Sequence, residues 1–134
     1  MNTSHSDTAP AAPLPAALSA GLRALFAGQD LLTTNSDCWA YGYDNSRRHA
    51  VPQAVCFASD ADQIRQLILL CREHRVPLVT RGRGTGTTGA TVPLRGGIVL
   101  SMERMRSELS IDPANRVAHV SPGYTNQELQ EAAA

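Results

Sequence analysis

The chain has 134 residues, and its 12 basic and 12 acidic side chains leave no formal net charge at pH 7. This length suffices for one domain with a hydrophobic core and is too short for two ordinary domains. A balanced charge provides no broad positive field, so the composition argues against nucleic acids and membrane surfaces as partners.

The first predicted segment, residues 1–15, combines prolines with alanine, serine and threonine, and we expect a disordered tail here. It lacks the basic start and apolar centre of a secretory signal. No stretch of the chain approaches the roughly 20 apolar residues that a membrane span requires. The 3 cysteines form no C-x-x-C pair, and we expect a soluble, cytoplasmic protein.

The second predicted segment, residues 16–50, contains a helix and an aromatic stretch. Four leucines recur at helical spacing: Leu14, Leu18, Leu22 and Leu25. Gly28 offers a C-terminal stop for this helix. Residues 37–46 hold the single tryptophan and two tyrosines, and we interpret them as a buried plug rather than a lid over a ligand, because aromatic side chains mostly supply buried area. Arg47 and Arg48 are interpreted as a solvated surface pair.

The third predicted segment, residues 51–134, begins with a β-α-β unit. Residues 54–57 form a short apolar strand, and Ser59 with Asp62 forms a near capping box for the following helix. One face of that helix carries an apolar stripe: Ile64, Leu67, Ile68 and Cys71. Residues 76–80 form a second strand, which we expect to pair in parallel with the first.

The rest of the chain is predicted to contain a third strand, a hairpin and a final helix. The strand covers residues 97–101, and the hairpin covers residues 109–120. Thr125 and Glu128 form a capping box for the last helix. This helix runs to Ala134 with no glycine, proline or basic turn at its end, so we expect a chain that is truncated within a larger fold.

The most distinctive segment is the loop between the second and third strands. It contains four glycines: Gly82, Gly84, Gly86 and Gly89. Glycines adopt positive φ and let the backbone approach a ligand, and successive N–H groups in such a loop form an anion nest. Three threonines add hydroxyl donors: Thr85, Thr87 and Thr88. Because Arg81 and Arg83 add two guanidinium groups, the loop is predicted to bind a pyrophosphate, with a flexible hairpin without ligand as the alternative.

Two common phosphate-binding motifs do not fit this loop. Residues 84–89 match the pattern G-x-G-x-x-G, which has meaning only where the loop opens a helix. No amphipathic helix of useful length fits into residues 90–95, which excludes the Rossmann interpretation. Ala90 stands where the Walker A motif requires a lysine, which excludes that motif as well.

Several segments together resemble a known family: residues 51–59, 81–89, 96–101, 111–115 and 121–123. They are similar to the FAD-binding PCMH-type domain of the vanillyl-alcohol oxidase superfamily, in its branch of glycolate oxidases and D-lactate dehydrogenases. The resemblance runs in unbroken order through residues 36–134. It implies an α+β fold, the N-terminal part of a PCMH-type FAD-binding domain, with a β-α-β unit and a small mixed sheet flanked by helices.

The resemblance implies that FAD is the cofactor and that the glycine loop wraps its pyrophosphate. The implied FAD-binding residues are Arg81, Gly82, Arg83, Gly84, Thr85, Gly86, Thr88, Gly89, Pro122 and Gly123. The last two resemble a second flavin-facing turn, although Pro-Gly is equally an ordinary turn. Several relatives attach the flavin through a histidine at the position of Thr85. A threonine forms no such bond, so the FAD is expected to be non-covalent.

The resemblance also implies a function, as part of a flavin-dependent oxidoreductase that acts on a D-2-hydroxy acid such as glycolate or D-lactate. The expected partners are the remaining part of the flavin domain and a substrate domain, and this chain alone is expected to be inactive. Asp44 and His119 are candidate bases by residue type alone, and we assign neither. The scattered histidines form no metal-ligand pattern. Two alternatives stay open: a non-catalytic nucleotide-binding or interaction module, and another FAD oxidase or reductase of the same fold.

Overall fold

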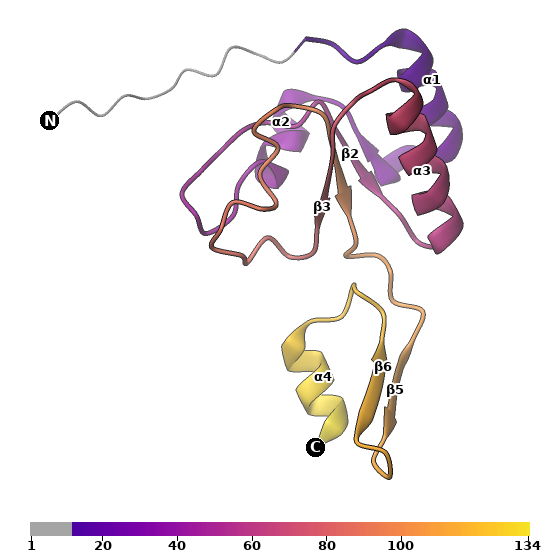
Figure 1. Cartoon of the computed structure of the whole chain (residues 1–134), viewed down its shortest axis with the longest axis vertical. Helices are drawn as coiled ribbons and strands as arrows, with labels where there is room; N and C mark the ends of the chain where they lie inside the picture. The colour runs from indigo at the N-terminus through magenta and orange to yellow at the C-terminus, as the bar shows by residue number, and fades with distance from the viewer. Residues whose placement is uncertain (1–11) are drawn as a thin grey trace, which may run out of the picture.

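The structure is a computed structural model that describes residues 12–134. In chain order its elements are α1 (Ala16–Leu25), the 3-10 helix η1 (Gly28–Asp30), β1 (Leu31–Leu32), α2 (Asn35–Cys38), the 3-10 helix η2 (Trp39–Tyr41), β2 (Ala54–Phe57), α3 (Ala61–Glu73), β3 (Leu78–Arg81), β4 (Ile98–Ser101), β5 (Leu109–Asp112), β6 (Val117–Val120) and α4 (Asn126–Ala133). Of the predicted disordered tail, residues 1–11 lie outside the described residues. Figure 1 traces this order from indigo to yellow.

The first four strands form one mixed sheet in the order β1-β2-β4-β3. β4 pairs in parallel with both β2 and β3, so that Ile98 faces Ala54 on one side and Leu78 on the other. β1 pairs antiparallel with β2. The predicted small mixed sheet is confirmed, but the direct pairing expected between residues 54–57 and 76–80 is wrong. All of β4 is buried, and this apolar strand occupies the protected position between the other two.

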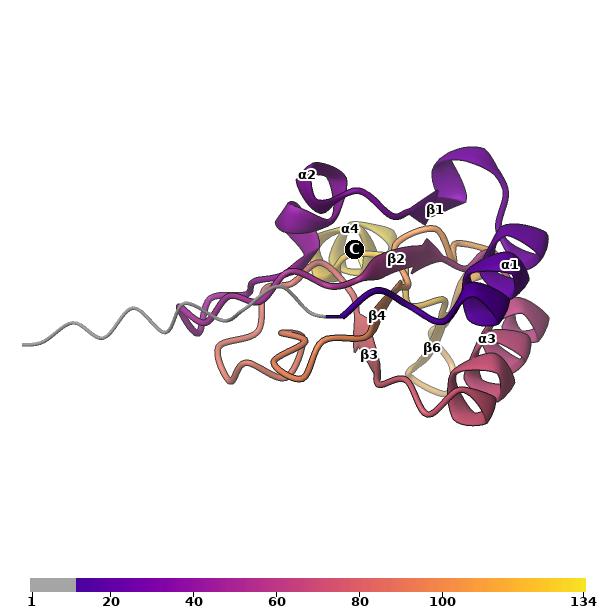
Figure 2. The same ribbon diagram turned by 90° about the horizontal axis from the view of Figure 1, so that it is seen from above.

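The two faces of the sheet are covered by different parts of the chain. On one face, α1 and α3 pack against alternate strand residues such as Ala54 and Ile98, with Leu22 and Leu67 completely buried between the layers. Figure 2 shows these two helices together at one side of the sheet. On the other face, Cys38 packs with the remaining strand residues. Both faces of β2 are therefore apolar and buried, as its four-residue apolar run predicted.

The helix α3 differs from its prediction at two positions. Its N-cap is Asp60, whose Oδ1 accepts the N–H of Gln63 at 2.8 Å, and not Ser59. Ser59 instead donates its N–H to the Gln63 side chain. Ile68, which was assigned to the apolar stripe, is 48% exposed. The face that packs on the sheet and on α1 is centred on Leu67, so a residue next to it in sequence points away.

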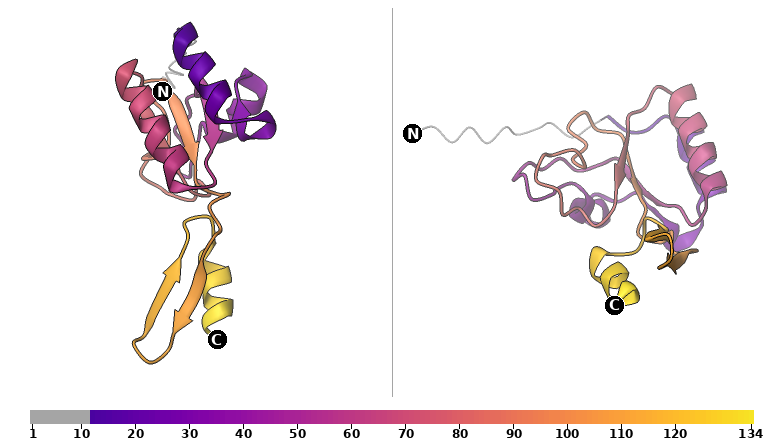
Figure 3. Two further views of the ribbon diagram at one scale, coloured as in Figure 1. Left: turned by 90° about the vertical axis from the view of Figure 1, so that its right-hand side faces the viewer. Right: turned by 60° about the horizontal axis from the view of Figure 1, so that its bottom comes forward.

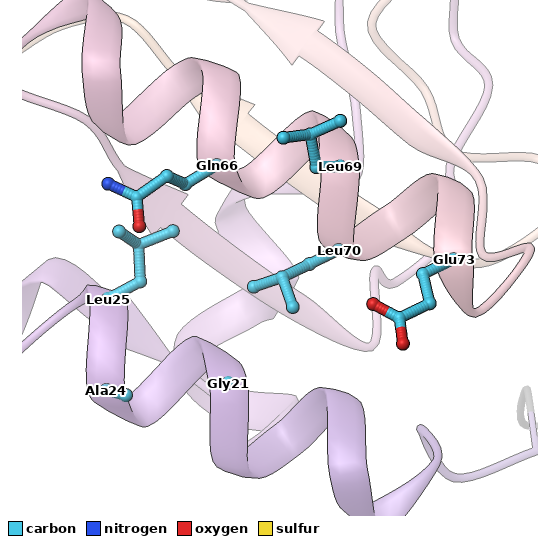
Figure 4. A pocket seen from close by; sticks show the side chains of 7 residues that line it. All are labelled: Gly21, Ala24, Leu25, Gln66, Leu69, Leu70 and Glu73. Atoms are coloured by element: carbon cyan, nitrogen blue, oxygen red, sulfur yellow. The ribbon is translucent and has the colours of Figure 1, made fainter.

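The two helices leave a groove of about 390 Å³ between them, lined by Gly21, Ala24, Leu25, Gln66, Leu69, Leu70 and Glu73 (Figure 4). The helices meet closely where a Cβ atom on Gly21 would lie 3.1 Å from a methyl group of Leu70. α1 ends at Leu25, before the predicted stop at Gly28, because Phe26 takes an extended conformation and is buried.

The prediction that the aromatic stretch forms a buried plug is wrong for two of its three rings. Trp39 is 54% exposed and Tyr43 is 42% exposed, and their ring centroids lie 5.5 Å apart. Tyr41 packs edge-on against Phe57, with 5.3 Å between ring centroids. Because Cys38 and Tyr41 already cover this face of the sheet, the neighbouring Trp39 faces outward.

The last part of the chain forms the predicted hairpin and helix. β5 and β6 pair antiparallel, with Asp112 opposite Val117 at the turn. Thr125 and Glu128 form the predicted capping box at the start of α4. Figure 3 shows the hairpin and α4 beside one another, beyond the four-stranded sheet. Among the helices of residues 12–134, none combines the length and apolar character of a membrane span.

Candidate functional site

The glycine loop leaves the carboxyl end of β3 at Arg81 and returns to β4 at Ile98. Open α/β sheets bind ligands beyond the carboxyl ends of their parallel strands, as predicted for this loop. The loop lies beside residues 39–50, on the side of the sheet away from α1 and α3 (Figures 1 and 2). The interhelical groove is therefore remote from the candidate site.

The four glycines of the loop fall into two classes. Gly84 and Gly89 have φ values of +68° and +81°, a conformation that L-residues avoid. Gly82 and Gly86 do not have positive φ. A Cβ atom on Gly82 would meet nothing within 4 Å, and one on Gly86 would meet the Asp44 carboxylate at 3.9 Å and no nearer atom. Two glycines thus shape the loop, and two leave its backbone uncovered.

The uncovered part of the loop carries donors and no acid. Thr85, Thr87 and Thr88 are all exposed, as is Gly86 between them. Within the described part of the chain, the N–H groups of residues 83–88 donate to no protein acceptor. Exposed N–H groups and hydroxyls around a bare backbone suit phosphate oxygens, which accept hydrogen bonds without donating any. These residues therefore fit a diphosphate group.

Arg81 reaches the loop at Gly84, where its guanidinium group fills the space that a Cβ atom would take. Its side chain is buried, and its guanidinium group donates to the carbonyl oxygen of Tyr43 at 2.5 Å. The same group lies 5.7 Å from the centre of the Tyr41 ring. The structure therefore shows Arg81 linking β3 to the aromatic stretch, and its predicted contact with the phosphate stays a prediction. Arg83 is exposed on the loop.

Asp44 anchors the loop from the neighbouring segment. It is buried, and its carboxylate accepts the N–H of Ser46 at 2.8 Å, the N–H of Gly89 at 3.0 Å and the hydroxyl of Thr91 at 3.4 Å. The Ser46 side chain first, and then these further donors, hold the pKa of Asp44 below its usual value. A carboxylate so occupied is a weak base, which supports leaving Asp44 unassigned as a catalytic base.

Asn45 adds two further bonds to the loop. Its N–H donates to the carbonyl oxygen of Gly86 at 2.9 Å, and its side-chain amide donates to the carbonyl oxygen of Thr85 at 3.2 Å. These bonds hold the carbonyl groups of Thr85 and Gly86 on the side of the loop that faces residues 44–46. Sequence reasoning missed this anchoring role, although an aspartate followed two residues later by serine is a typical Asx-turn pattern.

Pro122 and Gly123 lie in the turn between β6 and α4. The N–H of Gly123 donates to the carbonyl oxygen of Met105 at 2.8 Å, and a Cβ atom there would lie 2.7 Å from the carbonyl oxygen of Glu103. This glycine is required by close backbone packing, and no hydrogen bond among residues 12–134 joins the turn to the glycine loop. Its contact with flavin stays a prediction. His119 is exposed on β6, in the hairpin.

The cysteines and histidines of residues 12–134 add no second site. Burial raises the pKa of the Cys38 and Cys71 thiols to about 11, and burial also raises that of Cys56. Thiols in this state are poor nucleophiles and metal ligands. In the described residues, no group of three or more potential metal ligands comes together.

Comparison with known proteins agrees with this geometry. A family model described as an FAD binding domain matches residues 52–134. Glycolate oxidase subunit GlcD of Bacillus subtilis (strain 168) is 37% identical over 100 residues, which are 74% of this chain and 21% of that protein. D-lactate dehydrogenase of Archaeoglobus fulgidus is 36% identical over 99 residues, which are 70% of this chain and 22% of that protein.

A solved structure of p-cresol methylhydroxylase with substrate bound resembles this one with a TM-score of 0.74 and 25% sequence identity. The likeness covers 86% of this chain and 23% of that chain. It confirms the fold class predicted from the sequence. The chain spans about a fifth to a quarter of the length of the proteins that it matches.

Proposed function

Because this chain belongs to the family of PCMH-type FAD-binding domains, whose model matches residues 52–134, we propose that it holds FAD as part of an oxidoreductase acting on a D-2-hydroxy acid. The observation that carries the cofactor part is that the N–H groups of residues 83–88, at the carboxyl end of a parallel strand, donate to no acceptor in the described residues. The substrate class is supported by similarity to a glycolate oxidase subunit and a D-lactate dehydrogenase.

Different loop residues have different proposed roles in holding the cofactor. The N–H groups and hydroxyls of residues 85–88 would bind the pyrophosphate, with Gly82 and Gly86 allowing close approach. Gly84, Gly89 and Arg81 would keep the loop in shape. When bound, FAD supplies the redox chemistry, because the flavin ring accepts a hydride equivalent.

We further propose that the FAD is bound without a covalent link. Neither histidine nor cysteine occurs in residues 81–97. By the family resemblance, Thr85 stands where several relatives carry a flavin-bearing histidine. Acid precipitation of the loaded protein is therefore expected to release the flavin into the supernatant. Yellow colour that stays in the pellet would contradict this expectation.

The first test is a titration of the purified chain with FAD, followed by flavin fluorescence, with NAD as the control dinucleotide. We expect saturable binding of FAD and no binding of NAD, because no helix begins at the glycine loop to receive a Rossmann-type pyrophosphate. A chain that is folded by circular dichroism and binds neither dinucleotide would contradict the proposed function and favour an interaction module.

The substrate class needs a separate measurement, because the residues that contact a hydroxy acid are not assigned in this chain. We propose that the activity requires the remaining part of a flavin domain and a substrate domain. Supplied with these parts, the FAD-loaded protein is expected to reduce an artificial electron acceptor with glycolate or D-lactate. Activity with neither acid, but with a phenol or a sugar, would place it in another branch of the same fold.

A further inference from the structure

Arg48 lies against the glycine loop, although its position in an Arg-Arg pair suggested a solvated residue. We propose that the Arg48 guanidinium group binds the diphosphate of the cofactor and adds positive charge at the Gly89 end of the loop. This inference rests on the proposed function, since it names a ligand for the same FAD. It adds a residue that lies outside the loop itself, on the segment that Asp44 ties to it.

The position of Arg48 is given by its distances to Gly89. A Cβ atom on Gly89 would lie 3.2 Å from the Cδ atom of Arg48 and 3.6 Å from its Nη1 atom. The N–H of Arg48 donates to the Oγ atom of Ser46 at 3.3 Å, and that oxygen would lie 3.3 Å from the same Cβ atom. The end of the Arg48 side chain is thus beside the loop, next to its last glycine.

Arg48 also has a guanidinium group that no carboxylate among the described residues neutralises. In residues 12–134, the arginines that form ion pairs are Arg65, Arg104 and Arg106. Arg81 is buried and donates to a backbone carbonyl, whereas Arg48 is exposed. An exposed guanidinium group next to Gly89, at the end of the loop segment with unpaired N–H groups, can make the paired hydrogen bonds that suit phosphate oxygens.

The negative charge of Asp44 beside the loop is the reason that a cation such as Arg48 is needed there. Asp44 accepts the N–H of Gly89, and its lowered pKa keeps this carboxylate negative at neutral pH. A negative group behind the loop opposes the binding of an anion in front of it. A cation at Gly89 offsets that repulsion, so the loop can be anchored by a carboxylate and still attract a diphosphate.

Arg47 provides a matched control for this proposal. It is the preceding residue, is also exposed, and has the same charge. Its φ of +65° places it in the turn between Ser46 and Arg48, and none of the hydrogen bonds or ion pairs of residues 12–134 joins its side chain to the loop. Replacing either arginine with glutamine removes one positive charge from the same segment. A difference between the two variants therefore reports position and not net charge.

The test is a titration of the full chain and of the variants Arg48→Gln and Arg47→Gln with FAD, ADP and riboflavin. We expect Arg48→Gln to weaken FAD and ADP binding about tenfold, the effect of losing one exposed charge-assisted contact. Any binding of riboflavin, which has no phosphate, should not change. Arg47→Gln should bind FAD within about twofold of the unaltered chain, and added salt should weaken the Arg48→Gln variant less than the unaltered chain.

The outcomes separate this inference from the proposed function. Equal FAD affinity of Arg48→Gln and Arg47→Gln would overturn the role of Arg48 and leave the proposed function standing. A folded, unaltered chain that binds no FAD would overturn both. Thermal unfolding of each variant controls for misfolding, and Arg48→Lys, which keeps the charge, is expected to recover part of the lost affinity.

Discussion

The guanidinium group of Arg81 occupies the space in which a side chain at Gly84 would begin. Gly84 has a φ of +68°, and a Cβ atom there would overlap the end of the Arg81 side chain. Arg81 in turn donates to the carbonyl oxygen of Tyr43, so the loop, the strand and the aromatic stretch interlock. Gly84 is therefore required by the protein itself and not only by a ligand.

We expect Gly84→Ala to destabilise the chain. The left-handed backbone alone costs an L-residue about 1–2 kcal/mol, and displacement of Arg81 from its carbonyl partner adds to that cost. Urea unfolding measures the change. Gly82→Ala is the matched control, because its backbone is not left-handed and its Cβ atom would meet nothing within 4 Å. Equal stability of the two variants would contradict this account.

Gly86→Ala is expected to separate binding from folding. Its Cβ atom fits without a close contact, so the melting temperature should stay near that of the unaltered chain. The new methyl group would stand on the uncovered backbone, where the pyrophosphate is proposed to approach, and FAD affinity should fall at least about tenfold. A fluorescence titration measures it. Unchanged FAD affinity in Gly86→Ala, or in the bulkier Gly86→Val, would remove the loop from the binding site.

Asp44→Asn is expected to loosen the loop. The two carboxylate oxygens accept the N–H groups of Ser46 and Gly89, and an amide offers only one acceptor oxygen in their place. Hydrogen exchange of the Gly89 N–H should become faster, and FAD affinity should decrease. Asp62→Asn, on the exposed surface of α3, is the control. Slow exchange at Gly89 in the Asp44 variant would show that the loop is held by other contacts.

Acid should release this anchor in the unaltered chain. The folded-state pKa of Asp44 is lowered below its ordinary value of 3.8. The stabilisation is therefore present above that ordinary value and is lost as the pH falls through the lowered pKa. Exchange at Gly89, corrected for the intrinsic effect of pH, should accelerate in this acidic range. The Asp44→Asn variant should lack the transition.

The start of α4 should respond to acid for a similar reason. Arg106 first, and then the N–H and hydroxyl of Thr125, hold the pKa of Glu128 at about 2, against an ordinary 4.5. The ion pair and the capping box are thus present above pH 4.5 and are lost as the pH falls toward about 2. Chemical shifts of Thr125 measure the transition, and Glu128→Gln should abolish it. A midpoint near 4.5 would contradict the Arg106–Glu128 contact.

Local features of the structure were predictable because they depend on residues close in sequence. The hairpin of residues 109–120 follows from alternation and a turn, and the capping box at Thr125 needs only residues within one helical turn. The glycine loop was recognisable for the same reason. Even at this level one boundary moved, since Asp60 and not Ser59 caps α3, and such one-residue choices depend on how the helix docks.

Contacts across the fold were not predictable in this way. β4 lies between β2 and β3, which local patterns in the β-α-β unit cannot indicate. Trp39 is a residue type that usually lies in the core, but it is exposed because Cys38 and Tyr41 already cover this face of the sheet. Strand order and burial depend on which surfaces meet, and these surfaces come from segments far apart in the chain.

By itself the sequence indicated an α+β fold with a glycine-rich loop at a strand end, for which it predicted anion binding, and the family resemblance carried by its motifs indicated FAD as the cofactor. Tertiary structure decided what each loop residue does. The fold directs Arg81 to a backbone carbonyl group and brings the Asp44 carboxylate within hydrogen-bonding distance of the Gly89 N–H. It also places the end of the Arg48 side chain next to the last glycine of the loop. These side chains are separated from their partners by some forty residues, and only folding brings them within hydrogen-bonding or van der Waals distance.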